Sequence, residues 1–275
     1  MSALFPNLLH PLLFAHRGAS ALAPENTFDA FELGLKLGAH VLEMDAHLTK
    51  DGEVVVFHDA TLERTTNGHG LVCDKTLAEL RDLDAGYHFT RGENTHPFRG
   101  QGCQIPRLED VLRAFPTAGF NIELKDRIPS LVRPMLDILS RTGATNVLLA
   151  ASDDTIMADL EAAKPGCALG LSFGQVVAVL KASYFSCTIR EFRGRALQIP
   201  LRHGTLGLGL VPIATRRVIR AGHDRGMEVH LFTIDQADVA KQWLDRGADG
   251  IMSNDPGRLG SLFSRNQARS PQRSL

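Results

Sequence analysis

The sequence predicts an α/β protein built as a (β/α)8 TIM barrel, with a small insertion after the second barrel strand. Two observations carry this prediction. Eight short apolar segments follow one another over about 250 residues, and helical segments lie between most of them. One interval, from Lys50 to Arg107, is too long to hold only a helix.

The eight candidate strands are apolar runs that polar or turn-forming residues bound on either side. They lie at Leu12–His16, Val41–Ala46, Phe120–Lys125, Val147–Ala151, Ala168–Ser172, Ala196–Ile199, Met227–Thr233 and Gly250–Ser253. A doubly wound open sheet is the alternative arrangement. No Gly-rich dinucleotide loop follows the first strand, so the alternation favours the barrel.

The helical segments between the strands have recognisable ends. Apolar residues at helical spacing predict a helix over Thr27–Leu37. Ser130 is expected to cap the helix that follows the third strand, and another helix is expected over Thr215–Arg225. Asp235 is expected to cap the helix that runs to Gly247.

The long interval is expected to hold the insertion, at about residues 59–104. Asp51-Gly52 is a hairpin turn signal, and the apolar run Val54–Phe57 predicts a further short strand. Thr76–Glu79 has the pattern of a capping box that opens a short helix. The Gly- and His-containing stretch 86–102 is expected to be a loop.

Length and composition indicate an ordinary globular protein. The chain has 275 residues, which is enough for one large domain with a sizeable core. We expect a single domain over residues 1–263, and a disordered tail at 264–275 that is rich in Arg, Ser, Gln and Pro. The net charge is -1, so no broad basic surface indicates binding to nucleic acid or to an anionic membrane.

The compartment is predicted from the cysteines and from the apolar segments. The apolar start, Met1–Phe14, lacks a basic region and a cleavage site, so a signal peptide is not expected. No apolar run approaches the ~20 residues of a membrane span, which argues against stable membrane insertion. The cysteines lack paired spacing and are interpreted as reduced thiols of a cytoplasmic protein. They are Cys73, Cys103, Cys167 and Cys187.

Charged residues alternate with apolar residues inside two predicted strands. Glu43 and Asp45 share one face of the first of these, and Glu123 and Lys125 share one face of the second. Half-exposed antiparallel strands with solvated charges would show the same alternation. In a barrel, however, these side chains would meet at the carboxyl ends of the strands, where active sites lie.

Three converging carboxylates need a cation to remain ionised close together. Oxygen ligands suit one hard divalent ion, Mg²⁺ or Ca²⁺. The alternative is a structural network in which Lys125, Arg17 and Arg107 neutralise the carboxylates.

Two histidines add proton-transfer chemistry to this predicted site. His16 ends the first strand and His58 follows the apolar run of the extra strand. Two histidines near neutral pKa suit a general acid and a general base. Arg17 and Lys125 would stabilise the charge of a phosphate. Together with a cation, these groups suggest cleavage of a phosphoester.

These residues fall in short motifs whose order and spacing form a specific set. The motifs are His16-Arg17-Gly18, Pro24-Glu25-Asn26-Thr27, Glu43-Met44-Asp45, Thr49-Lys50-Asp51-Gly52, His58-Asp59, Leu62-Glu63-Arg64-Thr65-Thr66-Asn67-Gly68, Ile105-Pro106-Arg107-Leu108-Glu109-Asp110-Val111-Leu112, Asn121-Ile122-Glu123-Leu124-Lys125, Val229-His230-Leu231-Phe232-Thr233-Ile234-Asp235 and Gly247-Ala248-Asp249-Gly250-Ile251-Met252-Ser253-Asn254-Asp255-Pro256. The set resembles the glycerophosphodiester phosphodiesterase family over about residues 12–260.

The resemblance implies a barrel with an inserted subdomain and a hydrolase that converts a glycerophosphodiester to glycerol 3-phosphate and an alcohol. It implies Glu43, Asp45 and Glu123 as ligands of one divalent cation, His16 and His58 as the acid/base pair, and Arg17 and Lys125 near the phosphate. A water-soluble small-molecule glycerophosphodiester is the expected substrate.

The chain departs from the family pattern on the seventh strand. The family often has His-x-Trp-Thr-x-Asn there, where this chain has Phe232 and Asp235. Phe232 keeps an apolar wall that would flank the glycerol carbons, but it lacks the indole N–H donor. The Gly- and Leu-rich segment Gln198–Val211 has no match and would line the alcohol side. These differences bear on substrate preference.

Three other functions remain open. An enolase-like barrel also combines Mg²⁺ carboxylates with a lysine, but it places one ligand on each strand, whereas Glu43 and Asp45 share a strand. A lysophospholipase D-like enzyme would act on a lipid glycerophosphodiester and would favour an apolar rim. A non-catalytic phosphoester-binding barrel would lack a metal ligand or a histidine, and none is missing.

Overall fold

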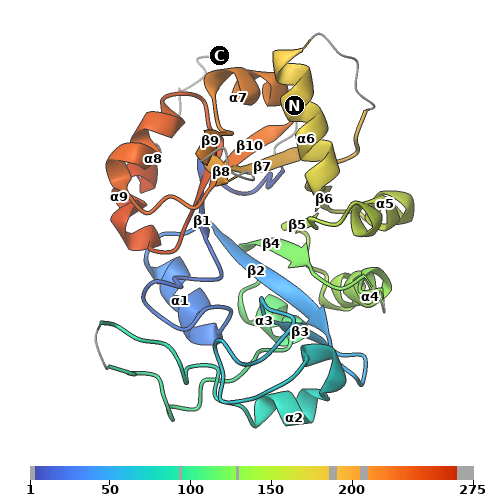
Figure 1. Cartoon of the computed structure of the whole chain (residues 1–275), viewed down its shortest axis with the longest axis vertical. Helices are drawn as coiled ribbons and strands as arrows, with labels where there is room; N and C mark the ends of the chain where they lie inside the picture. Colours follow the sequence, from blue (N-terminus) through green and yellow to red (C-terminus); the bar gives the residue numbers. More distant parts are fainter. Residues whose placement is uncertain (1–3, 93–94, 128–129, 186–190, 205–209, 265–275) are drawn as a thin grey trace, which may run out of the picture.

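The computed structural model describes residues 4–92, 95–127, 130–185, 191–204 and 210–264. In this part of the chain, eight parallel strands form a nearly closed barrel (Figure 1). They are β1 (Leu12–Ala15), β2 (Val41–Leu48), β4 (Gly119–Leu124), β5 (Val147–Ala150), β6 (Ala168–Leu169), β7 (Ala196–Pro200), β10 (Glu228–Phe232) and β11 (Gly250–Ser253). The barrel class is confirmed, and each barrel strand lies where the sequence predicted one.

The order of the strands around the barrel is β6-β5-β4-β2-β1-β11-β10-β7. A single parallel bridge between Gly170 and Ala196 joins the two ends of this order. Helices cover the outside of the strands (Figure 1). They are α1 (Phe28–Lys36), α3 (Leu108–Ala114), α4 (Val132–Thr142), α5 (Asp154–Ala163), α6 (Phe173–Tyr184), α7 (Arg216–His223), α8 (Ala237–Leu244) and α9 (Gly260–Ser264), with a 3-10 turn, η2 (Pro256–Arg258), before α9.

The helix caps confirm some expectations and correct two. Thr27 and Thr215 cap α1 and α7 through their hydroxyl groups. Leu131, rather than Ser130, is the N-cap residue of α4. Gln236, rather than Asp235, is the N-cap residue of α8. The Asp235 carboxylate turns instead toward β11, where it accepts hydrogen bonds that a helix start would not provide.

The segment between β2 and α3 extends beyond the barrel wall. β3 (Val54–Val56) pairs antiparallel with the last residues of β2, so β2 runs past the rim. Glu43 is the third of the eight residues of β2. It therefore lies further inside the barrel than the carboxyl end of the strand, where it was expected. η1 (Val72–Asp74) and α2 (Leu77–Arg81) follow, and the capping box of Thr76 and Glu79 is confirmed. The bounds of the insertion and of the domain stay predictions.

The amino-terminal end of the barrel is covered by the start of the chain. Phe5 is fully buried and packs in a cluster with Phe14 from β1 and with other inward-facing side chains. The backbone N–H of Leu4 donates to Glu228 at 2.9 Å. Burial raises the pKa of Glu228, but hydrogen bonds led by that from His10 outweigh burial and bring this pKa far below its usual value. The open end of the barrel is therefore the opposite one.

The segment after β7 forms a hairpin of β8 (Arg202–Gly204) and β9 (Leu210–Pro212). Cys73, Cys103 and Cys167 are free thiols, and Cys187 lies outside the described residues. Among the residues that the structure describes, no helix has the length and apolar character needed to cross a membrane. Most of the tail expected at 264–275 also lies outside them.

Candidate active site

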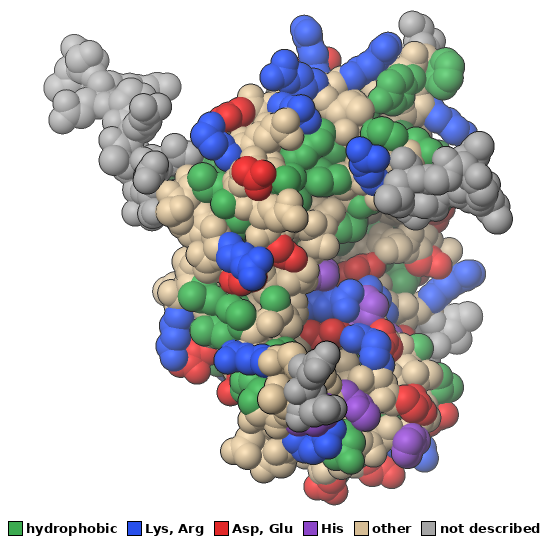
Figure 2. Space-filling model, turned by 60° about the vertical axis from the view of Figure 1, so that its left-hand side comes forward, with side chains coloured by type: hydrophobic (Ala, Val, Ile, Leu, Met, Phe, Trp, Pro, Cys, Tyr) green, Lys and Arg blue, Asp and Glu red, His purple; other side chains and the backbone are tan. Residues whose placement is uncertain are grey.

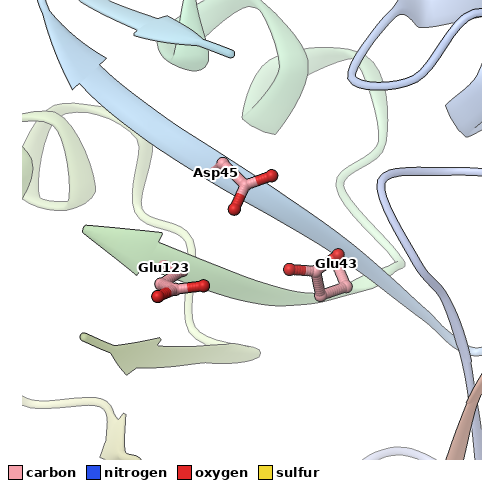
Figure 3. Close-up of side chains that lie close together, drawn as sticks. All are labelled: Glu43, Asp45 and Glu123. Carbon is pink, nitrogen blue, oxygen red and sulfur yellow. The ribbon is translucent and has the colours of Figure 1, made fainter. Parts of the chain in front are cut away.

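Three carboxylates converge inside the barrel (Figure 3). Glu43 and Asp45 project from β2, and Glu123 projects from the neighbouring β4, where it is the register partner of Asp45. One oxygen atom from each carboxylate lies within 4.8 Å of the others. Glu43 and Asp45 are buried, which contradicts the alternative of solvated charges on a half-exposed strand.

The positive charge near this acidic cluster is unevenly placed. Lys125 Nζ lies 2.9 Å from Asp45 Oδ1 and 2.8 Å from Glu123 Oε2. Burial raises the pKa of Asp45, but opposite charges, led by Lys125, outweigh burial and hold it below its usual value. Burial, and then the adjacent charge of Asp45, raise the pKa of Glu43 well above its usual value. A bound cation would therefore stabilise the ionised form of Glu43 in particular.

The cluster could hold a divalent cation, and one of the three cations of the alternative structural network is absent from it. Arg107, one of the three cations expected in such a network, lies elsewhere and pairs with Glu53 at 3.3 Å and with Asp110 at 3.2 Å. Asn121 precedes Glu123 on the same face of β4, and its Oδ1 is buried without a hydrogen-bond partner among the described residues. Carboxylate and amide oxygens are ligands of Mg²⁺ and Ca²⁺.

The loop after β1 directs two polar groups at the carboxylates of β2. Arg17 and Asn26 have positive φ angles of 54° and 57°, which residues other than glycine adopt uncommonly. This conformation lets the Arg17 N–H donate to Glu43 Oε2 at 2.8 Å. Asn26 Nδ2 donates to Asp45 Oδ2 at 2.9 Å. The loop therefore holds both carboxylates from the β1 side of β2, whereas Lys125 contacts Asp45 from the β4 side.

His16 directly follows the carboxyl end of β1 and lies beside this cluster. Its Nδ1 lies 2.8 Å from Asn254 Oδ1, and its Nε2 lies 3.9 Å from Glu43 Oε2. Burial is the main cause that lowers the pKa of His16, and the Arg17 charge adds to it. The neutral ring is therefore favoured, with Nε2 on the side of the acidic cluster.

His58 is held by a chain of charged groups. Its Nδ1 lies 2.6 Å from Asp59 Oδ1, and the other oxygen of Asp59 accepts a hydrogen bond from Arg64 Nε. Arg64 also donates two hydrogen bonds to Glu25, at 2.7 and 2.8 Å. Glu25 in turn accepts from Arg17 at 3.0 Å. The insertion and the loop after β1 are thus joined next to the acidic cluster.

A cavity of about 120 Å³ opens beside the acidic cluster. Its walls combine the two carboxylates Glu43 and Glu123 with polar and apolar side chains of the strands around them. The other lining residues are His16, Asn121, Ala150, Ala151, Ser152, Leu171, Gln198, Phe232 and Met252. On the face shown in Figure 2, basic, acidic and histidine side chains lie next to one another near the middle of the molecule, and further charged side chains lie above and below them.

The fold and this cavity define a class: barrel proteins with acidic and histidine side chains grouped at the carboxyl end of the strands. The model of the glycerophosphoryl diester phosphodiesterase family matches residues 16–157. The chain is 31% identical to the glycerophosphodiester phosphodiesterase of Caldanaerobacter subterraneus subsp. tengcongensis, covering 91% of this chain and 97% of that protein. A glycerophosphodiester phosphodiesterase of Bacillus subtilis is also 31% identical, and the match covers 91% of this chain and 86% of that protein.

A solved structure supports the same assignment. The glycerophosphodiester phosphodiesterase from Agrobacterium tumefaciens superposes with a TM-score of 0.72 and 26% identity, covering 91% of this chain and 99% of that one. The chain belongs to the glycerophosphoryl diester phosphodiesterase family. The family resemblance seen in the motifs is therefore confirmed, and this membership argues against an enolase-like enzyme.

The structure brings all the expected site residues into one region and adds others. Phe232 lines the cavity together with His16, and Gln198 marks the only part of the unmatched segment that does so within the described residues. Functional roles for Asn26 and Asn254 were not expected. Asn26 belongs to the motif Pro24-Glu25-Asn26-Thr27, but its contact with Asp45 depends on a left-handed backbone that the sequence does not reveal.

Proposed function

We propose that the protein hydrolyses water-soluble glycerophosphodiesters to glycerol 3-phosphate and an alcohol. The observation that carries this proposal is the grouping of two histidines and two cationic side chains around one buried acidic cluster. Membership of the family supports the same reaction. Arg17 and Lys125 would bind the phosphate, because each already lies against Asp45 and projects at the cavity end of the barrel.

We propose that Glu43, Asp45 and Glu123 hold one divalent cation, Mg²⁺ or Ca²⁺. A cation there would supply charge stabilisation for the phosphate oxygens and would lower the pKa of a coordinated hydroxyl group. Lys125 would hold Asp45 and Glu123 in place, since it bridges them. The N–H of Arg17 would orient Glu43 through their hydrogen bond.

The partners of the two histidines suggest different roles in proton transfer. His16 has a neutral amide at Nδ1, and burial favours its neutral ring. We assign it the role of general base toward the nucleophile, either a water molecule or the neighbouring glycerol hydroxyl; the second would give a cyclic phosphate. His58 has a carboxylate at Nδ1, which pairs well with a positively charged ring. We assign it the role of general acid toward the leaving alcohol.

The substrate would be recognised mainly through its glycerol phosphate half. Phe232 offers an apolar wall for the glycerol carbons, and the amides of Asn121 and Gln198 offer hydrogen bonds to hydroxyl groups within the same cavity. The departing alcohol would face the insertion and would be recognised loosely.

A second candidate substrate, a lysophospholipid, is favoured by one observation. Phe173 follows β6, is 62% exposed, and donates its backbone N–H to the carbonyl of Ser152, which lines the cavity. An exposed aromatic ring at the rim would contact an acyl chain. Lysophospholipase D-like activity would depend on this ring.

The cation requirement is tested by activity on glycerophosphocholine after removal of metal. We expect turnover to vanish in excess EDTA and to return with Mg²⁺ or Ca²⁺. Full activity of a metal-stripped sample in EDTA would reject the cation site. Full binding of substrate without turnover at any metal concentration would instead support the non-catalytic barrel.

The substrate class is tested by competition kinetics. We expect similar kcat/KM values across glycerophosphocholine, glycerophosphoethanolamine, glycerophosphoglycerol and glycerophosphoinositol. A lysophospholipid preferred by ~10²-fold, worth about 2.7 kcal/mol, would establish the lipid substrate instead. In that case Phe173→Ser should reduce turnover of the lysophospholipid and leave glycerophosphocholine unaffected.

A further inference from the structure

Asn254 stands between His16 and a carboxylate that the reaction does not use. On one side, Asn254 Oδ1 lies 2.8 Å from His16 Nδ1. On the other side, Asn254 Nδ2 donates to Asp235 Oδ2 at 2.9 Å. Asp235 Oδ1 accepts two more hydrogen bonds, from the Ser253 hydroxyl at 2.8 Å and from the Asn254 backbone N–H at 2.7 Å.

This arrangement determines which way the Asn254 amide faces. The oxygen and nitrogen of an amide side chain are otherwise assigned only from their hydrogen-bond partners. An ionised carboxylate accepts hydrogen bonds and donates none, and Asp235 is ionised at neutral pH because these hydrogen bonds outweigh burial and lower its pKa. The NH₂ group of Asn254 must therefore face Asp235, and its oxygen must face His16. The hydroxyl of Ser20 lies 3.1 Å from the same oxygen and 2.8 Å from the His16 carbonyl oxygen; its single proton can go to only one of them, so the orientation is determined by Asp235.

The orientation of the amide then determines the tautomer of His16. Because Asn254 presents an oxygen, His16 must carry its proton on Nδ1 to make this hydrogen bond. Its Nε2 is left with a lone pair on the side of the cavity, 3.9 Å from Glu43. A general base needs that free lone pair. We propose that Asp235 is a positioning residue that fixes the tautomer and orientation of His16 through Asn254.

The substitution Asp235→Asn gives a specific test, because it replaces one carboxylate oxygen, a hydrogen-bond acceptor, with an NH₂ group, a donor. The amide oxygen of the new side chain would keep the hydrogen bonds from Ser253 and from the Asn254 backbone. Its NH₂ group would then face the NH₂ group of Asn254, and two donors cannot bond. Asn254 would relieve this by rotating its amide, which presents NH₂ to His16 and moves the ring proton to Nε2.

The tautomer is measured directly by NMR of protein labelled with ¹⁵N in its histidines, at an alkaline pH where the rings are neutral. The His16 signals are identified by their loss in His16→Ala. We expect the Nδ1–H form in the natural sequence and the Nε2–H form in Asp235→Asn. A His16 ring that keeps the Nδ1–H form in Asp235→Asn, or that is Nε2–H in the natural sequence, would overturn the proposal.

The kinetic part of the proposal rests on the proposed function. For glycerophosphocholine we expect Asp235→Asn to lower kcat by at least about 10-fold, the scale for residues that orient a catalytic group, with KM nearly unchanged. In a His16→Ala background the same change should have no further effect. Asp238→Asn, an exposed carboxylate in the first turn of α8, is the matched control and should behave as the natural sequence.

Two results keep this inference separate from the function. If the tautomer reverses as expected but the protein does not hydrolyse glycerophosphodiesters, the positioning role stands and the function fails. If hydrolysis occurs while Asp235→Asn keeps both the tautomer and full kcat, the positioning role fails and the function stands. Should Asp235→Asn fold poorly, Asn254→Ala provides a second variant, in which a mixture of both tautomers is expected.

Discussion

The two histidines of the site have the same local geometry but very different surroundings. Each ring is held through Nδ1, His16 by an amide oxygen at 2.8 Å and His58 by a carboxylate oxygen at 2.6 Å. The partners of His16 belong to the barrel itself, at the ends of β10 and β11. The partner of His58, Asp59, follows β3 and is held by the insertion residue Arg64. The barrel supplies a neutral partner and the insertion supplies a charged one.

This difference suggests how one fold obtains both an acid and a base. Two imidazoles have the same intrinsic chemistry, so different roles must come from their surroundings. Closely packed barrel elements suit the ring whose neutral form is needed. A more exposed segment rich in charge suits the ring that must hold a proton.

The largest expected effect comes from removing each ring in turn. His16→Ala and His58→Ala should each lower kcat on glycerophosphocholine by ~10²-fold or more, the usual scale of general acid–base catalysis. On a glycerophosphodiester whose leaving group is p-nitrophenol, the loss in His58→Ala should shrink, because that alcohol leaves without protonation. The loss in His16→Ala should remain. Equal losses on both substrates would show that the roles are not divided in this way.

Removal of a carboxylate beside His16 should have the next largest effect. In Glu43→Gln the amide keeps the shape of the side chain but loses its charge, so Mg²⁺ or Ca²⁺ should bind at least about 10-fold more weakly by calorimetry. Glu32→Gln, on the exposed face of α1, is the control and should bind the ion normally. Unchanged affinity in Glu43→Gln would mean that this residue is not a ligand.

Weakening of the charged partner of His58 should have a smaller effect. Arg64→Gln removes ion pairs that are partly exposed, each worth up to about 1 kcal/mol, so kcat should fall by up to about 5-fold. Raising the salt concentration should reduce the difference between the two proteins. Arg81 lies in the same insertion and forms an exposed ion pair with Asp110 of α3. As the control, Arg81→Gln removes this pair and should leave kcat unchanged. If both changes had the same effect, Arg64 would have no particular link to His58.

The smallest expected effect concerns pH. Burial lowers the pKa of His16 below the ordinary value of 6.5, so its neutral form persists at pH values where a free histidine is already protonated. The NMR titration of the His16 ring should therefore have its midpoint below pH 6.5, and kcat/KM should fall only as pH drops through that midpoint. A midpoint at or above 6.5 would contradict the role of general base assigned to His16.

The sequence predicted the barrel well because its signals are local. Each strand is a short apolar run, and the alternation within Val41–Ala46 was enough to place Glu43 and Asp45 on one face. The pairing of these residues with Glu123 followed from the rule that parallel strands align their ends.

The sequence could not predict the partners that come from distant parts of the chain. Asp235 precedes a helical pattern, so it was assigned to a helix cap, yet its oxygens bond residues 18 and 19 positions further along. Asn254 contacts a histidine 238 positions away. Arg107 was named only in the alternative structural network, on charge alone, and the structure shows that its partners include Glu53 and Asp110.

The chain of ion pairs from Asp59 through Arg64 and Glu25 to Arg17 has a consequence for protein engineering. Exchange of the insertion for the corresponding segment of another barrel is an obvious route to altered head-group preference. Such a graft would replace Asp59 and Arg64, whereas their partners Glu25 and Arg17 would remain in the recipient barrel. A transplanted segment should therefore dock only when the charges on the two sides of the junction match, and hybrids chosen by sequence length alone would leave His58 loosely held.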